Sequence, residues 1–179
     1  MFAEKAGLAQ RVEAALRTVK DFPAAGVLFY DISPVLRDKE LFHDVIEYFA
    51  LELAPLQPTH IVGIEARGFI LGGAVALALG CGFIPIRKAG KLPPPTTQVT
   101  YDLEYGSETL EIAAGAIEPG ARVVIIDDVL ATGGTARAAA DLMLGEGVAL
   151  AGFGFLLELV AMNGREHIRK YPTICLIAC

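Results

Sequence analysis

The sequence is poor in the residues that build disulfide scaffolds and zinc sites. It has three cysteines and three histidines in 179 residues, and they form neither a CxxC pair nor a close cluster of histidines. Small domains held by disulfides are rich in cysteine, and structural zinc sites take four such ligands, usually in closely spaced pairs. We therefore expect no disulfide framework and no metal bound by protein ligands, and the cysteines indicate reduced thiols in a cytoplasmic protein.

An excess of positive charge is also missing. The formal net charge is −6, and the isoelectric point is near 5.1. Proteins that hold nucleic acid through its phosphates carry a basic face, so no nucleic-acid partner is expected. A few cations in one pocket can still bind a small anion on an acidic protein.

We expect neither a targeting signal nor a membrane span from the sequence. The N-terminal segment mixes Glu4 and Glu13 with cations and has no apolar core, so it resembles neither a signal peptide nor a transit peptide. Residues 68–86 are uncharged and almost long enough to span a bilayer. Glycines and Pro85 divide this stretch, which predicts a short helix and a buried strand instead of a membrane span.

The chain has ample material for a buried core, because 54% of its residues are hydrophobic. Apolar stripes predict helices over 8–19 and over 38–53, the second with Asp38 as N-cap and Pro55 at its end, and a third helix over 135–144. Apolar runs predict strands at 27–29, 60–64, 83–86, 122–127, 148–157 and 174–178. Strands that alternate with helices indicate an α/β fold with a mostly parallel central sheet flanked by helices. We expect one domain over 1–179.

One long segment, residues 87–112, interrupts this alternation of strands and helices. It begins with three cations and contains three consecutive prolines, Pro93–Pro95. The segments 100–103 and 108–112 flank a Tyr-Gly-Ser turn, which predicts an antiparallel hairpin. This segment is expected to form a flexible loop.

The most informative segment is Arg122–Ala136, RVVIIDDVLATGGTA. Its strand delivers two carboxylates, Asp127 and Asp128, to the sheet edge where α/β proteins bind ligands. The small, hydroxyl-rich turn that follows begins a helix, and backbone N–H groups at a helix N-terminus bind anions. Neighbouring carboxylates can accept hydrogen bonds from a sugar diol. Together these features predict a site for a ribose 5-phosphate.

Other nucleotide motifs do not fit. No GxxxxGK[ST] sequence is present, so the chain has no P-loop. Gly152 and Gly154 begin a GxGxxG pattern, but Leu157 takes the place of its third glycine. Dinucleotide binding is therefore the weaker alternative.

The segment VVIIDDVLATGGT resembles the phosphoribosyl-diphosphate (PRPP) motif of type I phosphoribosyltransferases. Residues 87–112, RKAGKLPPPTTQVTYDLEYGSETLEI, resemble the flexible loop of the adenine phosphoribosyltransferase family. Residues 21–36, 61–69 and 156–166 also match that family, in its order. The resemblance thus covers most of the chain.

This resemblance implies purine salvage, in which adenine and PRPP give AMP and diphosphate, with Mg²⁺ bound mainly through PRPP. It assigns the 5-phosphate to the turn Ala131, Thr132, Gly133, Gly134 and Thr135. It assigns the ribose hydroxyls to Asp127 and Asp128. The cations expected to contact the diphosphate are Arg67, Arg87, Lys88 and Lys91, because guanidinium and ammonium groups match phosphate oxygens.

Glu104 is the residue to which the resemblance assigns the chemistry. Adenine loses its N9 proton when the glycosidic bond forms, and a carboxyl group that exchanges a proton at N7 would ease this change. The loop that carries Glu104 would close over PRPP and exclude water, hinging for instance at Gly90 and Gly106.

The adenine pocket is assigned by resemblance to the N-terminal segment 1–35 and to one later residue. Leu28, Phe29 and Tyr30 would line it on one side, and Leu159 on the other. Tyr30 and Ala25 stand where the family commonly has Arg and Pro. A cation in the pocket is therefore missing, and adenine selectivity is indicated more by the loop than by the pocket.

Two alternatives remain: a phosphoribosyltransferase for hypoxanthine, guanine, xanthine or a pyrimidine, and a PRPP-sensing regulator without catalysis. A regulator of that kind usually carries a DNA-binding segment and a basic face, which this sequence lacks. The resemblance also implies a cytoplasmic homodimer, in which Arg87 reaches across the interface.

Overall fold

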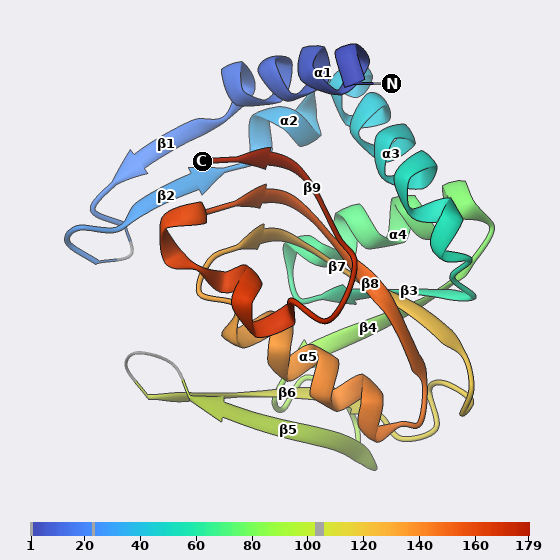
Figure 1. Ribbon diagram of the computed structural model, residues 1–179. Helices are drawn as coiled ribbons and strands as arrows, with labels where there is room; N and C mark the ends of the chain where they lie inside the picture. The colour runs from blue at the N-terminus through green and yellow to red at the C-terminus, as the bar shows by residue number, and fades with distance from the viewer. Residues whose placement is uncertain (1, 23, 103–105) are drawn as a thin grey trace. The chain divides into compact units, whose positions relative to one another are not determined.

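The computed structural model describes residues 2–22, 24–102 and 106–179 (Figure 1). The chain divides into two compact units, Met1–Tyr48 and Phe49–Cys179. The expectation of one domain over the whole chain stays a prediction.

The first unit combines helices with a two-stranded antiparallel sheet. Its elements are α1 (Phe2–Ala15), β1 (Arg17–Lys20), β2 (Leu28–Asp31), α2 (Ser33–Arg37) and the first part of α3 (Lys39–Leu53). The predicted helix over 8–19 is wrong beyond Ala15, because Val19 lies in β1, opposite Phe29 of β2. Thr18 and Val19 are β-branched and favour a strand once a partner strand is available. The strand predicted at 27–29 is shifted to β2.

Helix α3 begins as the sequence predicts. Asp38 Oδ1 accepts hydrogen bonds of 3.0 Å from the backbone N–H groups of Glu40 and Leu41. Asp38 is therefore the N-cap, and the bond from Leu41 above all holds the pKa of its carboxyl group below its usual range. The helix ends at Leu53, and Pro55 lies in the following short 3-10 helix η1 (Ala54–Leu56).

The second unit is built on a seven-stranded sheet in the order β5-β6-β4-β3-β7-β8-β9. Its strands are β3 (His60–Ile64), β4 (Gly82–Lys88), β5 (Thr96–Asp102), β6 (Ser107–Ala113), β7 (Arg122–Leu130), β8 (Ala149–Glu158) and β9 (Thr173–Ala178). Strands β4, β3, β7, β8 and β9 run parallel, while β6 pairs antiparallel with β4 and β5. The α/β fold with a mostly parallel sheet is confirmed, as is the hairpin.

Two helices connect the central strands in opposite directions along the sheet. Helix α4 (Arg67–Leu79) joins β3 to β4, and α5 (Gly134–Gly145) joins β7 to β8 (Figure 1). Parallel crossovers are right-handed, so the two helices cover opposite faces of the sheet. The order of the strands therefore reverses between β3 and β7, and open α/β sheets bind ligands at such a point.

The charge-free stretch 68–86 is divided as predicted, into most of α4 and the first part of β4. Over the described part of the chain, no helix combines the length and apolar character that a bilayer crossing needs. After β8 come two short 3-10 helices, η2 (Val160–Met162) and η3 (Gly164–Ile168).

Strand β7 is longer than predicted, because its pairing with β8 continues to Leu130 opposite Glu158. The two aspartates thus lie inside the last part of a paired strand and not beyond it.

Candidate active site

The end of β7 lies against the start of α4. A Cβ atom on Gly68 would lie 2.7 Å from the carbonyl oxygen of Ile126 and 3.1 Å from Asp127 Oδ1. Only glycine permits this approach. As a result Arg67, the first residue of α4, places its Nε 2.7 Å from Asp128 Oδ2. The predicted meeting of Arg67 with the two carboxylates at one sheet edge is therefore present.

The two carboxylates are held in an unfavourable environment for charge. Asp128 is 3% exposed, and its backbone N–H donates to Asp127 Oδ1 at 2.9 Å. Burial, and then the charge of Asp128, raises the pKa of Asp127 well above its usual value. Burial also raises the pKa of Asp128, while the guanidinium of Arg67 opposes that rise. Ligand hydroxyl donors, or a developing positive charge, would stabilise the ionised pair.

A small cavity lies beside these carboxylates, at the N-terminus of α5. Its volume is about 80 Å³. It is lined by Asp127, Val129, Leu130, Ala131, Thr132, Gly133, Thr135, Ala136 and Phe155. Four of the five residues predicted to hold a phosphate therefore face one space, where the helix dipole and unpaired N–H groups favour an anion.

The turn before α5 packs closely against the backbone of Gly164. Gly133 has φ +84°, and a Cβ atom on it would lie 2.3 Å from the carbonyl oxygen of Gly164. A Cβ atom on Gly164 would in turn lie 2.1 Å from the carbonyl oxygen of Ala131. The two backbones therefore touch with no room for a side chain. Sequence reasoning did not select Gly164, although it lies in the family-like segment 156–166.

The hairpin is tied to the same turn by Tyr101, which sequence reasoning also missed. Its hydroxyl donates to Glu108 Oε2 at 2.7 Å and lies 3.0 Å from Thr135 Oγ1, which can donate to it. Burial raises the pKa of Tyr101 to about 12, so the phenol stays protonated. The alternation of Val99 and Tyr101 on the buried face of β5 was the available signal.

Three of the four predicted diphosphate cations, Arg67, Arg87 and Lys88, have carboxylate partners in this structure. Arg87 donates to both carboxylate oxygens of Glu65, at 3.3 and 2.9 Å. Glu65 also accepts the backbone N–H of Lys88 at 3.0 Å, and the Lys88 ammonium pairs with Glu108. The bonds from Arg87 lower the pKa of Glu65, so it remains a charged competitor for the guanidinium.

Glu111 holds the first part of the segment 87–112 in place. It is 1% exposed, and its Oε1 accepts the backbone N–H groups of Lys91 and Leu92 at 2.8 and 2.9 Å. Its Oε2 accepts Gln98 Nε2 at 3.0 Å. Burial opposes ionisation, but these hydrogen bonds prevail and lower the pKa of Glu111. No sequence pattern distinguished it from other hairpin carboxylates.

Several predicted site residues stay predictions. Glu104 lies outside the described residues. Leu28, Phe29 and Tyr30 form most of β2 in the first unit, whereas Leu159 directly follows β8 in the second. The proposed hinges Gly90 and Gly106 have φ values of +79° and +92°, which suit glycine.

Comparison with known proteins shows which family has this sequence and this site. Residues 36–178 match the family model described as a phosphoribosyl transferase domain. A curated adenine phosphoribosyltransferase of Synechococcus sp. (strain RCC307) is 52% identical over 161 residues, which is 90% of this chain and 91% of the relative.

Solved structures agree in fold over almost the whole chain. The Saccharomyces cerevisiae adenine phosphoribosyltransferase, complexed with adenine and an imino-altritol bisphosphate, superposes with a TM-score of 0.91 and 42% identity. The superposition covers 96% of this chain and 99% of that one. The Giardia lamblia enzyme with 9-deazaadenine gives a TM-score of 0.90 and 37% identity over 96% and 97% of the two chains. The chain belongs to the adenine phosphoribosyltransferase family.

Proposed function

We propose that this chain salvages adenine by transferring the 5-phosphoribosyl group of PRPP to it, which gives AMP and diphosphate. The observation that carries the proposal is the cavity at the N-terminus of α5, which is lined by Asp127, the neighbour of Asp128 in the chain. An anion site next to two hydroxyl acceptors has the chemistry of a ribose 5-phosphate. The adenine and 9-deazaadenine in the relatives' structures support the choice of base.

The sugar is held by β7 and the turn after it. Backbone N–H groups and hydroxyls of residues 131–135 bind the 5-phosphate. Asp127 and Asp128 accept the ribose hydroxyls. They also place negative charge near the anomeric carbon, which becomes cation-like as the bond to diphosphate breaks.

The leaving diphosphate is bound by Arg67, Arg87, Lys88 and Lys91. Arg67 begins α4, just after β3, and its Nε lies beside Asp128, so it reaches the same edge as the sugar. Arg87 and Lys88 exchange their carboxylate partners for phosphate oxygens, which guanidinium groups also bind through paired hydrogen bonds.

Mg²⁺ is expected to arrive with PRPP. Among the residues that the structure describes, no group of three or more His, Cys, Asp or Glu side chains is arranged to hold a metal ion. Because Mg²⁺ usually keeps waters and binds through substrate phosphates, this donor set fits a substrate-borne ion. When bound, the ion would neutralise charge on the departing diphosphate.

Glu104 handles the proton of the base in this proposal, and the loop at 87–112 covers the site during the reaction. Leu28, Phe29, Tyr30 and Leu159 surround adenine. The active form is a homodimer in the cytoplasm, as in the family to which the sequence is similar.

The test is a panel of free bases at fixed PRPP and Mg²⁺. We expect adenine to be converted with a kcat/KM at least ~100-fold above that of hypoxanthine, guanine or xanthine, because a site that pairs with a base's polar edge rejects the mismatched edge. Equal or reversed preference would assign the chain to the other purine enzymes. PRPP binding without turnover of any base would support the regulator.

A further inference from the structure

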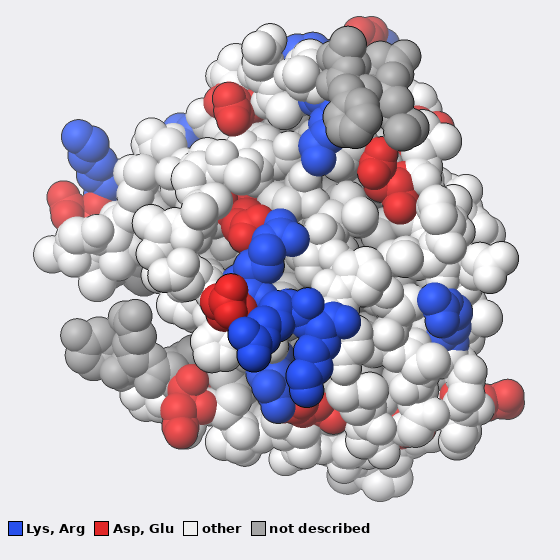
Figure 2. Space-filling view, viewed as in Figure 1, with Lys and Arg blue, Asp and Glu red and all other residues white. Residues whose placement is uncertain are grey.

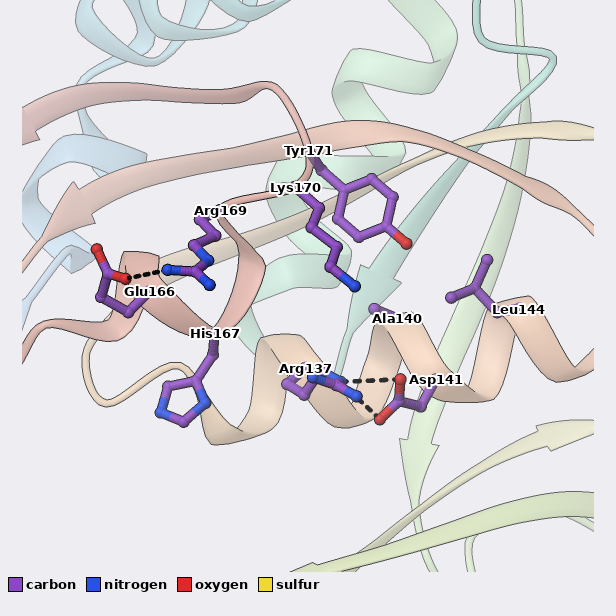
Figure 3. A pocket seen from close by; sticks show the side chains of 9 residues that line it. All are labelled: Arg137, Ala140, Asp141, Leu144, Glu166, His167, Arg169, Lys170 and Tyr171. Carbon is purple, nitrogen blue, oxygen red and sulfur yellow. Dashed lines mark hydrogen bonds and ion pairs between the residues drawn. The ribbon is translucent and has the colours of Figure 1, made fainter.

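A second and larger cavity lies away from the carboxylate pair, between α5, η3 and the residues that follow η3. Its volume is about 460 Å³. Its lining is Arg137, Ala140, Asp141, Leu144, Glu166, His167, Arg169, Lys170 and Tyr171 (Figure 3). None of these residues has a part in the proposed reaction. Ligand pockets commonly measure ~300–1,000 Å³, so the cavity has the size of a small-molecule site.

One end of this cavity is cationic. Arg137 donates through Nε to both oxygens of Asp141, at 2.9 and 2.8 Å, and Arg169 lies 3.4 Å from Glu166. Lys170 is exposed and has no ion-pair partner within the described parts of the chain. Three permanent cations thus face two carboxylates. Figure 2 shows Lys and Arg side chains gathered over η3 and α5, although the whole chain has a net charge of −6.

The other end is apolar. Ala140 and the 42% exposed Leu144 present one side of α5, and Tyr171 stands opposite them with its hydroxyl directed toward Leu144 (Figure 3). The Tyr171 ring is anchored edge-to-face on Phe153, with centroids 5.9 Å apart. Lys170 extends from the neighbouring position toward α5 (Figure 3). An aromatic face and an ammonium group therefore border one space.

We infer that this cavity binds a nucleotide at a second site, distinct from the PRPP site. The base would lie against Tyr171 and Leu144, where ring stacking and apolar contact favour it. The phosphates would pair with Lys170 and the guanidinium groups at the cationic end. A free phosphate would use only the cationic end, and a free nucleoside only the apolar end.

The walls of the cavity are the elements that support the phosphate turn. Helix α5 begins at Gly134, within that turn, and η3 begins at Gly164, whose backbone touches Gly133. A ligand that contacts both α5 and η3 can therefore shift the turn at 131–135 from the side opposite the PRPP site. Binding at the second site changes the affinity for PRPP through this contact.

The binding test uses the intact chain with its active site saturated by PRPP, which carries no base, and GTP as the calorimetric probe. We expect one GTP per chain. Guanosine and inorganic diphosphate, which each supply half of the ligand, should bind at least tenfold more weakly. Lys170→Ala should weaken GTP binding at least tenfold, while the control Lys39→Ala, an exposed lysine outside the cavity, should leave it unchanged. Equal binding by Lys170→Ala, diphosphate as tight as GTP, or no binding would each overturn the inference.

A kinetic test addresses the link to the turn. GTP should shift the KM for PRPP at least twofold in the wild type and not in Lys170→Ala, whose rate without GTP should be unchanged. An identical shift in both proteins would mean that GTP competes at the active site, which overturns the link. Because binding is measured without turnover, the second site can fail while adenine transfer succeeds, and the reverse.

Discussion

The two halves of the candidate active site differ in how far they are built without a substrate. On the sugar side, the turn at 131–135 is held by glycine contacts, and Asp127 and Asp128 lie in a paired strand. On the diphosphate side, Arg87 and Lys88 are paired with Glu65 and Glu108. The backbone of the first half is therefore in place, and its one ion pair joins Asp128 to Arg67, whereas Arg87 and Lys88 in the second half must exchange their partners.

This difference has an energetic meaning. The pKa values of Asp127 and Asp128 are raised, so their ionised forms destabilise the folded protein until a ligand provides hydrogen-bond donors. The partly exposed ion pairs of Arg87 and Lys88 contribute little to stability, typically up to ~1 kcal/mol each, and are readily exchanged. We infer that contacts on the sugar side determine the affinity for PRPP. The cations on the diphosphate side then exchange their partners when PRPP binds.

The largest effect is expected from removing charge on the sugar side. Asp127→Asn combined with Asp128→Asn should reduce kcat/KM at least ~10³-fold, because loss of a single preorganised electrostatic contact costs ~10²–10³-fold. PRPP binding, measured by calorimetry, should weaken as well. Unchanged PRPP affinity would show that the carboxylates do not contact the ribose.

The same comparison predicts a gain in stability from Asp127→Asn alone. The pKa of Asp127 is raised in the folded chain, so the unfolded chain ionises this group more readily. The resulting destabilisation is absent below the unfolded-state pKa of about 4 and grows as the pH rises. Asp127→Asn should therefore have a higher Tm than the wild type at pH 7, with a difference that shrinks toward pH 4. A lower Tm at pH 7 would contradict the burial argument.

A smaller but still large effect is expected at Glu104, on the loop that carries the diphosphate cations. Glu104→Gln keeps the shape of the side chain and removes its proton exchange, so kcat should fall about 100-fold with little change in PRPP affinity. The control is Asp102→Asn, which removes a charge from the same hairpin and should change kcat less than twofold. A nearly unchanged kcat for Glu104→Gln would remove its role.

The sequence predicts the sugar side far better than the supports around it. Apolar runs locate the strands because burial requires them, and the Gly-Thr turn is local, so both are visible within a dozen residues. The supports depend on distant partners: Gly164 on Gly133, Tyr101 on Thr135 and Glu111 on Lys91. No local pattern encodes such contacts. The length of β7 was missed for the same reason, since its pairing with β8 determines where it ends.

An intermediate effect is expected from the glycine contact behind the turn. Gly133→Ala forces a Cβ atom against the Gly164 carbonyl at a positive φ, which costs ~1–3 kcal/mol of strain unless the turn shifts. The KM for PRPP should rise about tenfold, the equivalent of about 1.4 kcal/mol. Gly134→Ala is the matched control, because its Cβ would make only ordinary contacts, with Tyr101 at 3.7 Å and Thr132 Oγ1 at 3.9 Å. If both variants behave alike, the Gly133–Gly164 contact does not define the turn.

The smallest effect is expected from releasing a cation on the diphosphate side. Glu65→Gln removes the charge that competes for Arg87, so the affinity for diphosphate should rise about two- to fivefold in a calorimetric titration. The free energy of unfolding should change by less than ~1 kcal/mol, since Arg87 and Glu65 are both partly exposed. A weaker affinity would mean that Glu65 positions Arg87 for the diphosphate instead of competing with it. In that case the diphosphate side would also be organised before the substrate binds, and the contrast between the two halves would disappear.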